Sequence, residues 1–146
     1  MQDWQVYREI LLDHRKNPRY NKIPERFTNI VVGNFQECMD HLQIAWLVQN
    51  SKINKIGFEG EGCSVSTASA SLLVNFCIGK KIDELVNKLQ NFISVLMNQD
   101  QILELEKWGE IAALSAIRKE SSRLLCAGFP WRTFIAGLKG EKTFFN

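Results

Sequence analysis

Several features that mark common classes of small protein are absent from this sequence of 146 residues. None of its four cysteines belongs to a Cys-x-x-Cys pair, which argues against zinc fingers, zinc ribbons and thioredoxin-type redox motifs. The 18 Lys and Arg nearly balance the 16 Asp and Glu, and no basic stripe is present, so we expect no nucleic-acid partner. Because the apolar runs are all short, we also expect no segment that spans a membrane.

The beginning of the chain does not resemble a secretion signal. Asp3 and Glu9 interrupt the stretch that a signal peptide would keep apolar, so we expect a cytoplasmic protein. Disulfide bonds are then not expected, because the cytoplasm keeps thiols reduced. Hydrophobic residues make up 45% of the chain, which is enough for a core without covalent staples, and the length favours one domain over residues 1–146.

The order of the predicted elements favours an α+β fold. An amphipathic helix comes first, three short strands rich in Val, Ile and Phe follow, and the remainder has helical periodicity. Asn50-Ser51 fits a hairpin turn between the second and third strands. We therefore expect a small three-stranded antiparallel sheet with helices packed on one face. The predicted helices cover residues 3–16, 65–77, 82–97, 103–117 and 121–138, and the strands cover 27–34, 41–49 and 53–59.

The last two predicted helices have distinctive sequences. Pro130 lacks the amide N–H that a helix interior needs, so we expect the regular part of the last helix to begin near Phe129, with Pro130 in its first turn. The apolar residues that define the 103–117 helix are Leu105, Trp108, Ile111, Leu114 and Ile117.

Three cysteines and one aspartate are candidates for a shared metal site. Cys38 and Asp40 stand two apart at the start of a strand, so their side chains point the same way. Cys63 lies between glycines and a helix start, where free amides favour a thiolate, and Cys126 lies just before or within the first turn of the last helix. Three thiolates and one carboxylate complete a tetrahedral set, and soft sulfur ligands select zinc or iron–sulfur chemistry.

A purely structural role is the alternative for each of these side chains. Free cysteine often packs as a small hydrophobe, and this interpretation suits Cys77 best, because it ends an apolar helix. We therefore leave Cys77 out of the site. Strand alternation sends His41 to the face opposite Asp40, so we expect a surface histidine there. We expect His14 to pack from its helix against the sheet.

Three longer motifs point to one family. Residues 7–19 (YREILLDHRKNPR) closely resemble the pattern Y-x-x-x-x-x-D-H-x-x-N-P-R that opens the NifU-like iron–sulfur assembly proteins, whose branches include IscU and SufU. Residues 58–71 (FEGEGCSVSTASAS) resemble that family's second signature, F-x-G-x-G-C-x-I-S-x-A-S-A-S. Residues 123–127 (RLLCA), followed by Trp131, are similar to its third. The resemblance covers nearly the whole chain.

Within this family the sequence is most similar to the SufU branch. There are 62 residues between Cys63 and Cys126, a longer interval than in the IscU branch, and Arg123 matches the SufU pattern. The resemblance implies a zinc-holding protein that accepts persulfide sulfur from a SufS-like cysteine desulfurase and passes it to downstream iron–sulfur assembly or acceptor proteins. Cys38 is the predicted acceptor, because it stands on a loop that can swing outward, and the resemblance suggests the same role.

Two other functions remain open at this point. In an IscU-type scaffold, Cys38, Cys63 and Cys126 would hold a transient [2Fe–2S] cluster, or iron, together with Asp40. In a structural zinc domain they would only stabilise a surface for protein interaction, although such sites prefer four closed nitrogen or sulfur ligands. The sequence does not decide whether the protein is a zinc-dependent sulfurtransferase or a non-enzymatic scaffold.

The chain departs from the family pattern beside two of the predicted ligands. Its residues 34–40 (NFQECMD) replace the family's N-P-T-C-G-D, so that Met39 stands where the family has glycine. If that glycine has a positive φ, Met39 is strained or the loop is rebuilt. Leu125 stands where the IscU branch has a histidine ligand and the SufU branch usually a lysine.

Overall fold

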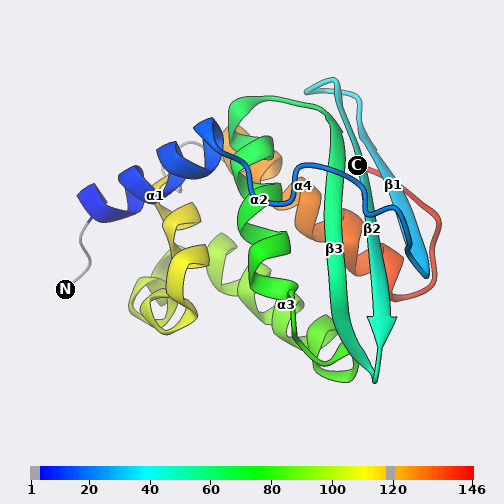
Figure 1. Cartoon of the computed structure of the whole chain (residues 1–146). Helices are drawn as coiled ribbons and strands as arrows, with labels where there is room; N and C mark the ends of the chain where they lie inside the picture. The colour runs from blue at the N-terminus through cyan, green and yellow to red at the C-terminus, as the bar shows by residue number, and fades with distance from the viewer. Residues whose placement is uncertain (1–3, 118–120) are drawn as a thin grey trace.

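The computed structural model describes residues 4–117 and 121–146. The elements in chain order are α1 (Trp4–Lys16), β1 (Asn29–Phe35), β2 (Asp40–Gln49), β3 (Lys52–Glu61), α2 (Ser64–Cys77), α3 (Ile82–Met97), the 3-10 segment η1 (Gln99–Ile117), α4 (Ser121–Leu138) and β4 (Thr143–Phe145). Helices cover one face of a twisted sheet, and α1 lies on the side of α2 that faces away from the sheet (Figure 1).

The sheet has one strand more than the sequence predicts. Its order is β3-β2-β1-β4, with β1, β2 and β3 antiparallel as expected and β4 parallel to β1. β4 has only three residues, too few for an alternating pattern to stand out in the sequence. The β2–β3 turn follows the prediction, because Asn50 and Ser51 both have positive φ, 53° and 62°, as a type I′ hairpin turn requires.

The core lies between the sheet and the helices α2, α3 and α4. Its members form one continuous hydrophobic cluster that spans both layers. The arrangement confirms the predicted α+β class. In the described part of the chain, no helix is both long and apolar enough to cross a membrane. The largest fully buried side chains include Trp46, Phe92, Phe129, Trp131 and Phe134.

The segment predicted as a helix over 103–117 is instead a succession of 3-10 turns, Gln99–Ile117. Gly109 has a φ of +72°, which an α-helix cannot contain, so regular α-helix is interrupted there. The apolar residues in this stretch recur at intervals of three, the number of residues in one 3-10 turn, whereas an α-helix alternates intervals of three and four.

Pro130 lies inside α4, so the prediction that the regular helix starts near Phe129 is wrong. The helix begins eight residues earlier, at Ser121. The proline ring removes the N–H that would otherwise bond the carbonyl of Cys126. Pro130 and its neighbours in the chain, residues 126–131, are all buried. This packing outweighs the local preference for a proline in the first turn of a helix.

His14 packs against α2 rather than against the sheet, contrary to expectation. Its Nδ1 lies 2.7 Å from the Oγ of Ser71, and the backbone N–H of Arg19 donates to the same hydroxyl oxygen at 2.7 Å. On the other side, its Nε2 lies 3.8 Å from a carboxylate oxygen of Glu110. The imidazole is fully buried and joins α1, α2 and η1.

Acidification is expected to loosen this junction. Burial lowers the pKa of His14, helped by the positive charge of Arg19 and opposed by Glu110 and Asp13. The unfolded chain then binds a proton more readily than the folded one, so the free energy of unfolding should fall as the pH drops below about 6.5. Urea unfolding of the parent and of His14→Gln between pH 7.5 and 5 tests this. The variant should be less stable throughout but less dependent on pH, and parallel curves would contradict the assignment.

Candidate metal centre

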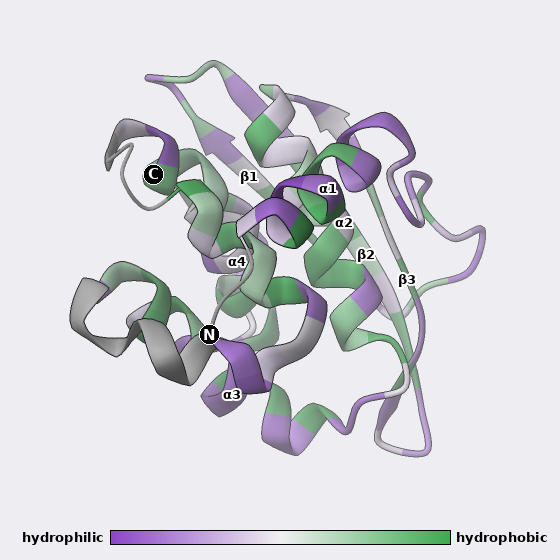
Figure 2. Cartoon of the chain, turned by 90° about the vertical axis from the view of Figure 1, so that its left-hand side faces the viewer, coloured by the Kyte–Doolittle hydropathy of each residue, from purple (hydrophilic) through white to green (hydrophobic). Residues whose placement is uncertain are grey.

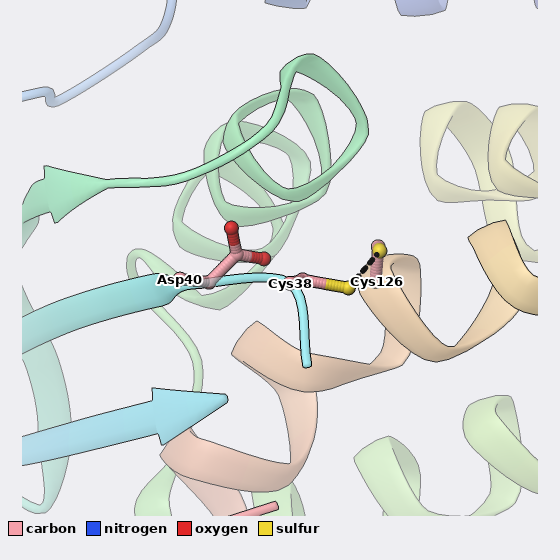
Figure 3. A group of neighbouring side chains, drawn as sticks. All are labelled: Cys38, Asp40 and Cys126. Atoms are coloured by element: carbon pink, nitrogen blue, oxygen red, sulfur yellow. Dashed lines mark hydrogen bonds between the residues drawn. The ribbon is translucent and has the colours of Figure 1, made fainter. Parts of the chain in front are cut away.

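The four predicted ligands come from three distant segments that meet at one end of the sheet. Cys38 stands in the turn between β1 and β2, and Asp40 is the first residue of β2. Cys63 immediately precedes α2, and Cys126 lies on α4. Figure 3 shows the side chains of Cys38 and Cys126 pointing toward one another, with the Asp40 carboxylate beside them.

Two thiols and one carboxylate form the tightest part of this cluster. The Sγ atoms of Cys38 and Cys126 are 3.0 Å apart. One ligand atom from each of Cys38, Asp40 and Cys126 lies within 4.8 Å of the other two. Such spacing allows all three atoms to reach one cation of the size of zinc, whose bonds to sulfur and oxygen are about 2.0–2.3 Å long.

Cys63 lies outside this close group of three, but its backbone contacts Asp40 and its thiol interacts with that of Cys126. It is the N-cap of α2, in extended conformation, and its Sγ accepts from the N–H of Ser66 at 3.4 Å. Its own N–H donates to Oδ1 of Asp40 at 3.0 Å. The thiol therefore faces free amides at a helix start, the surroundings that the sequence predicts for it.

Burial sets the charge state of the two most enclosed ligands. It raises the pKa of the Asp40 carboxyl, and the hydrogen bonds from Cys63 and Ser66 oppose this shift only in part. Burial also raises the pKa of the Cys126 thiol, and the neighbouring thiols of Cys38 and Cys63 raise it further. A bound divalent cation reverses these preferences, because a coordinated thiol loses its proton outright.

One oxygen of Asp40 supports the fit of a cation. Oδ2 is buried and has no hydrogen-bond partner among the described residues. Leaving a buried carboxylate oxygen unpaired costs about 1–3 kcal/mol or more, and a cation between it and the thiols would remove that cost. The pocket is shaped for this carboxylate, because a Cβ on Gly62 would stand 3.0 Å from Oδ1.

A short hydrogen-bond chain fixes α4 against α2 directly behind the thiols. The Ser69 hydroxyl of α2 donates to the carbonyl of Ala127, next to Cys126. The indole N–H of Trp131 donates to the same hydroxyl oxygen at 2.9 Å. Composition and spacing did not reveal this supporting role of Ser69.

Composition and spacing also did not reveal the role of Ser66, whose amide bonds the thiol of Cys63. The one local signal was that Ser66 stands three residues after the N-cap, where its amide can bond the cap side chain.

The position of Cys126 differs from the prediction. It is the sixth residue of α4, in the second turn, rather than before or within the first turn. The free amides of a helix start therefore do not reach its thiol, and its 7% exposure makes it an enclosed side chain. The expectations for Cys77 and His41 are confirmed. Cys77 is fully buried in the core, and His41 is exposed on the face opposite Asp40.

Two apolar side chains are exposed beside the ligands. Met39, between Cys38 and Asp40, has a φ of +55° and is 86% exposed. Leu125, next to Cys126, is 41% exposed. The position where the family pattern has glycine therefore has a left-handed backbone conformation, and this conformation is strained for Met39.

Met39→Gly is expected to raise the free energy of unfolding by about 1 kcal/mol, because glycine adopts positive φ without a steric penalty. Met39→Ala is the matched control: it shortens the same side chain but keeps the Cβ and hence the strain. Urea unfolding of the three proteins measures the difference. Equal stability of the glycine and alanine variants would show that the loop stores no strain at this residue.

Comparisons with known proteins agree with this architecture. Residues 6–127 match the family model of the NifU-like N terminal domain. The zinc-dependent sulfurtransferase SufU of Bacillus subtilis is 31% identical over 139 residues, which cover 94% of this chain and 92% of that protein. The iron–sulfur cluster assembly scaffold protein IscU of Streptococcus pyogenes is 26% identical over 134 residues, which cover 92% of this chain and 83% of that protein.

Solved structures share the fold at lower identity. FiSufU from the thermophile Fervidobacterium islandicum superposes with a TM-score of 0.77 at 23% identity, covering 94% of this chain and 99% of that one. The N-terminal NifU-like protein of Brucella abortus superposes with a TM-score of 0.75 at 11% identity, covering 92% of each chain. With the family model covering most of its length, the chain belongs to the NifU-like N terminal domain family.

Proposed function

We propose that this protein is a zinc-dependent sulfur acceptor of the SufU type, which takes persulfide sulfur from a SufS-like cysteine desulfurase. The observation that carries the proposal is the buried, unpartnered Oδ2 of Asp40 beside two thiols 3.0 Å apart. In this proposal Cys38, Asp40, Cys63 and Cys126 hold the metal. The zinc would keep the thiols deprotonated near neutral pH.

Cys38 is the proposed acceptor. It is half-buried on a turn, whereas Cys126 is enclosed in a helix and Cys63 caps another. It can therefore leave the cluster without disturbing a helix or strand. Its thiolate would attack the outer sulfur of the donor's persulfide, forming a new S–S bond as the old one breaks and the donor's cysteine leaves as a thiolate. Downstream iron–sulfur assembly or acceptor proteins would then take the sulfur, in the cytoplasm.

A scaffold function is the second candidate, favoured by the likeness to the Streptococcus pyogenes scaffold protein. The same three cysteines and Asp40 would hold a transient [2Fe–2S] cluster before its transfer. Leu125 weighs against this candidate, because it stands where the IscU branch has a histidine ligand. The hydrocarbon side chain of Leu125 offers no ligand atom.

Metal analysis combined with desulfurase turnover separates the two functions. The purified protein should contain about one zinc per chain, and it should stimulate cysteine turnover by a SufS-type desulfurase. Cys38→Ser should remove the stimulation, whereas Cys77→Ser, the matched control in the core, should retain it. Iron with acid-labile sulfide and a visible chromophore, without stimulation, would favour the scaffold function.

A further inference from the structure

A cavity of about 430 Å³ opens beside the metal centre and takes no part in the function described so far. It lies between α1, the start of α2, the end of η1 and the start of α4. Two of its lining residues adjoin the ligands: Ser64 follows Cys63, and Arg123 precedes Cys126 by one helical turn. The residues that line it are Arg8, Leu11, Leu12, Arg15, Ser64, Val65, Ala68, Ala116, Ile117 and Arg123; we call this the α1 groove.

The charge of the α1 groove is of one sign. Among the residues that the structure describes, its lining includes Arg8, Arg15 and Arg123 and no acidic side chain. Within the described part of the chain, Arg8 and Arg15 have no ion pair and no side-chain hydrogen bond, and both are exposed. This groove therefore attracts carboxylates, although the chain as a whole carries a net charge of only +2.

The floor of the groove is apolar. Leu11, Val65 and Ile117 are partly buried there, and Leu12 is 43% exposed. On α1 the groove residues follow the spacing 8, 11, 12 and 15, so that a leucine pair stands between two arginines on one helix face. Figure 2 views this side of the molecule, with α1 lying across α2 and its ribbon carrying both hydrophilic and hydrophobic colours.

These features fit a protein segment better than a small anion. Arg8 and Arg15 are seven residues apart on a helix, so their Cα atoms are about 10 Å apart along the axis. A single phosphate held between them would leave the leucines on the same face uncovered. A segment with two or more carboxylates flanking an apolar side chain can bond both guanidinium groups and cover the leucines between them.

We propose that the α1 groove docks an acidic segment of the cysteine desulfurase, with an apolar side chain between its carboxylates. The inference rests on the proposed function and adds to it a surface and a recognition chemistry. A segment held there lies directly beside Cys63 and Cys126, so that docking brings the donor's persulfide to the metal centre. The arginines would act mainly on the rate of association and its dependence on salt, as exposed interface charges do.

The test compares charge reversals at two places on the surface. Arg8→Glu/Arg15→Glu reverses the α1 groove, and the double change Lys55→Glu/Lys22→Glu alters the net charge equally on the far side of the sheet from the helices. The Kd for a purified SufS-type desulfurase is measured by titration calorimetry at 50 and 200 mM NaCl. The groove variant should bind at least tenfold more weakly at 50 mM with a flatter salt dependence, and the control should stay within about twofold of the parent.

Two further measurements keep the inference separable from the proposed function. Circular dichroism and zinc content should be unchanged in Arg8→Glu/Arg15→Glu, as should sulfur acceptance from a small persulfide donor that needs no docking. Leu12→Asn should also weaken desulfurase binding, because it removes apolar contact but no charge.

Equal affinities of the parent and the groove variant would overturn the inference while leaving the sulfur-acceptor function intact. Equal losses in the groove variant and the control would also overturn it, because only net charge would then matter. Displacement of the desulfurase by millimolar inorganic phosphate alone, at constant ionic strength, would assign the groove to a small anion instead. A parent protein that neither binds the desulfurase nor accepts sulfur would overturn the proposed function itself.

Discussion

Asp40→Ala is expected to make the bound zinc at least tenfold more labile toward a competing chelator. The carboxylate is one of four proposed ligands, and its removal leaves three thiolates with an open position that water can fill. It also removes the acceptor of the Cys63 amide, so the start of α2 loses a hydrogen bond of 3.0 Å. Sulfur acceptance should continue, because no thiol is lost.

Asp40→Cys should have the opposite effect. A fourth thiolate makes a closed set of sulfur ligands, which holds zinc as structural sites do. The metal should then leave more slowly than from the parent, and Cys38 should accept sulfur more slowly, because ligand exchange at the metal is hindered. Asp40→His should act in the same direction.

The measurement is zinc release to a chromogenic chelator, run beside desulfurase-coupled turnover. Asp83→Ala serves as the matched control, since Asp83 is an exposed aspartate on α3 outside the metal centre. If both Asp40 variants release zinc and accept sulfur at the parent's rates, Asp40 is not a ligand. The fourth partner would then be a water molecule, because His41, the other candidate by spacing, lies on the opposite face and bonds Asn34.

Much of the fold follows from local sequence patterns. The helix over Ile82–Met97 was predicted to the residue, because its apolar face repeats without interruption. The predictions of the fold that were wrong concern features that tertiary packing determines. The pairing of β4 depends on β1, which is more than a hundred residues earlier in the chain, and Pro130 is tolerated inside α4 because the surrounding side chains hold it.

The metal centre was predictable from its residue types but not from its geometry. Strand alternation predicted that Cys38 and Asp40 point the same way, and their ligand atoms do lie close together. The reason is different, because Cys38 stands in a turn and Met39 between them has a φ of +55°, so the two residues are not part of one extended strand. Nothing local indicates that Oδ2 of Asp40 is left without a partner, because that depends on how α2 and α4 close around it. The second-turn position of Cys126 likewise depends on where α4 begins, which the proline obscured.

The pair Cys126→Ala and Cys77→Ala provides the sharpest test of which cysteines matter. Both side chains are buried, with 7% and 0% exposure, and both changes remove one sulfur atom from the interior. Loss of packing should therefore be similar, about 1 kcal/mol each. Only Cys126 lies within reach of the other proposed ligands, at 3.0 Å from the Sγ of Cys38.

Cys126→Ala is accordingly expected to lose most of its zinc and its stimulation of the desulfurase, whereas Cys77→Ala should keep both. The remaining ligands in the first variant are two thiols and a carboxylate, too few for a closed site, and their burial then favours protonation over metal binding. Zinc content by atomic spectroscopy and unfolding of the metal-free proteins in urea separate the effect on the site from the effect on packing. Zinc loss from Cys77→Ala would mean that the chosen thiols are the wrong ones, since a core thiol with a pKa raised by burial would then be a ligand.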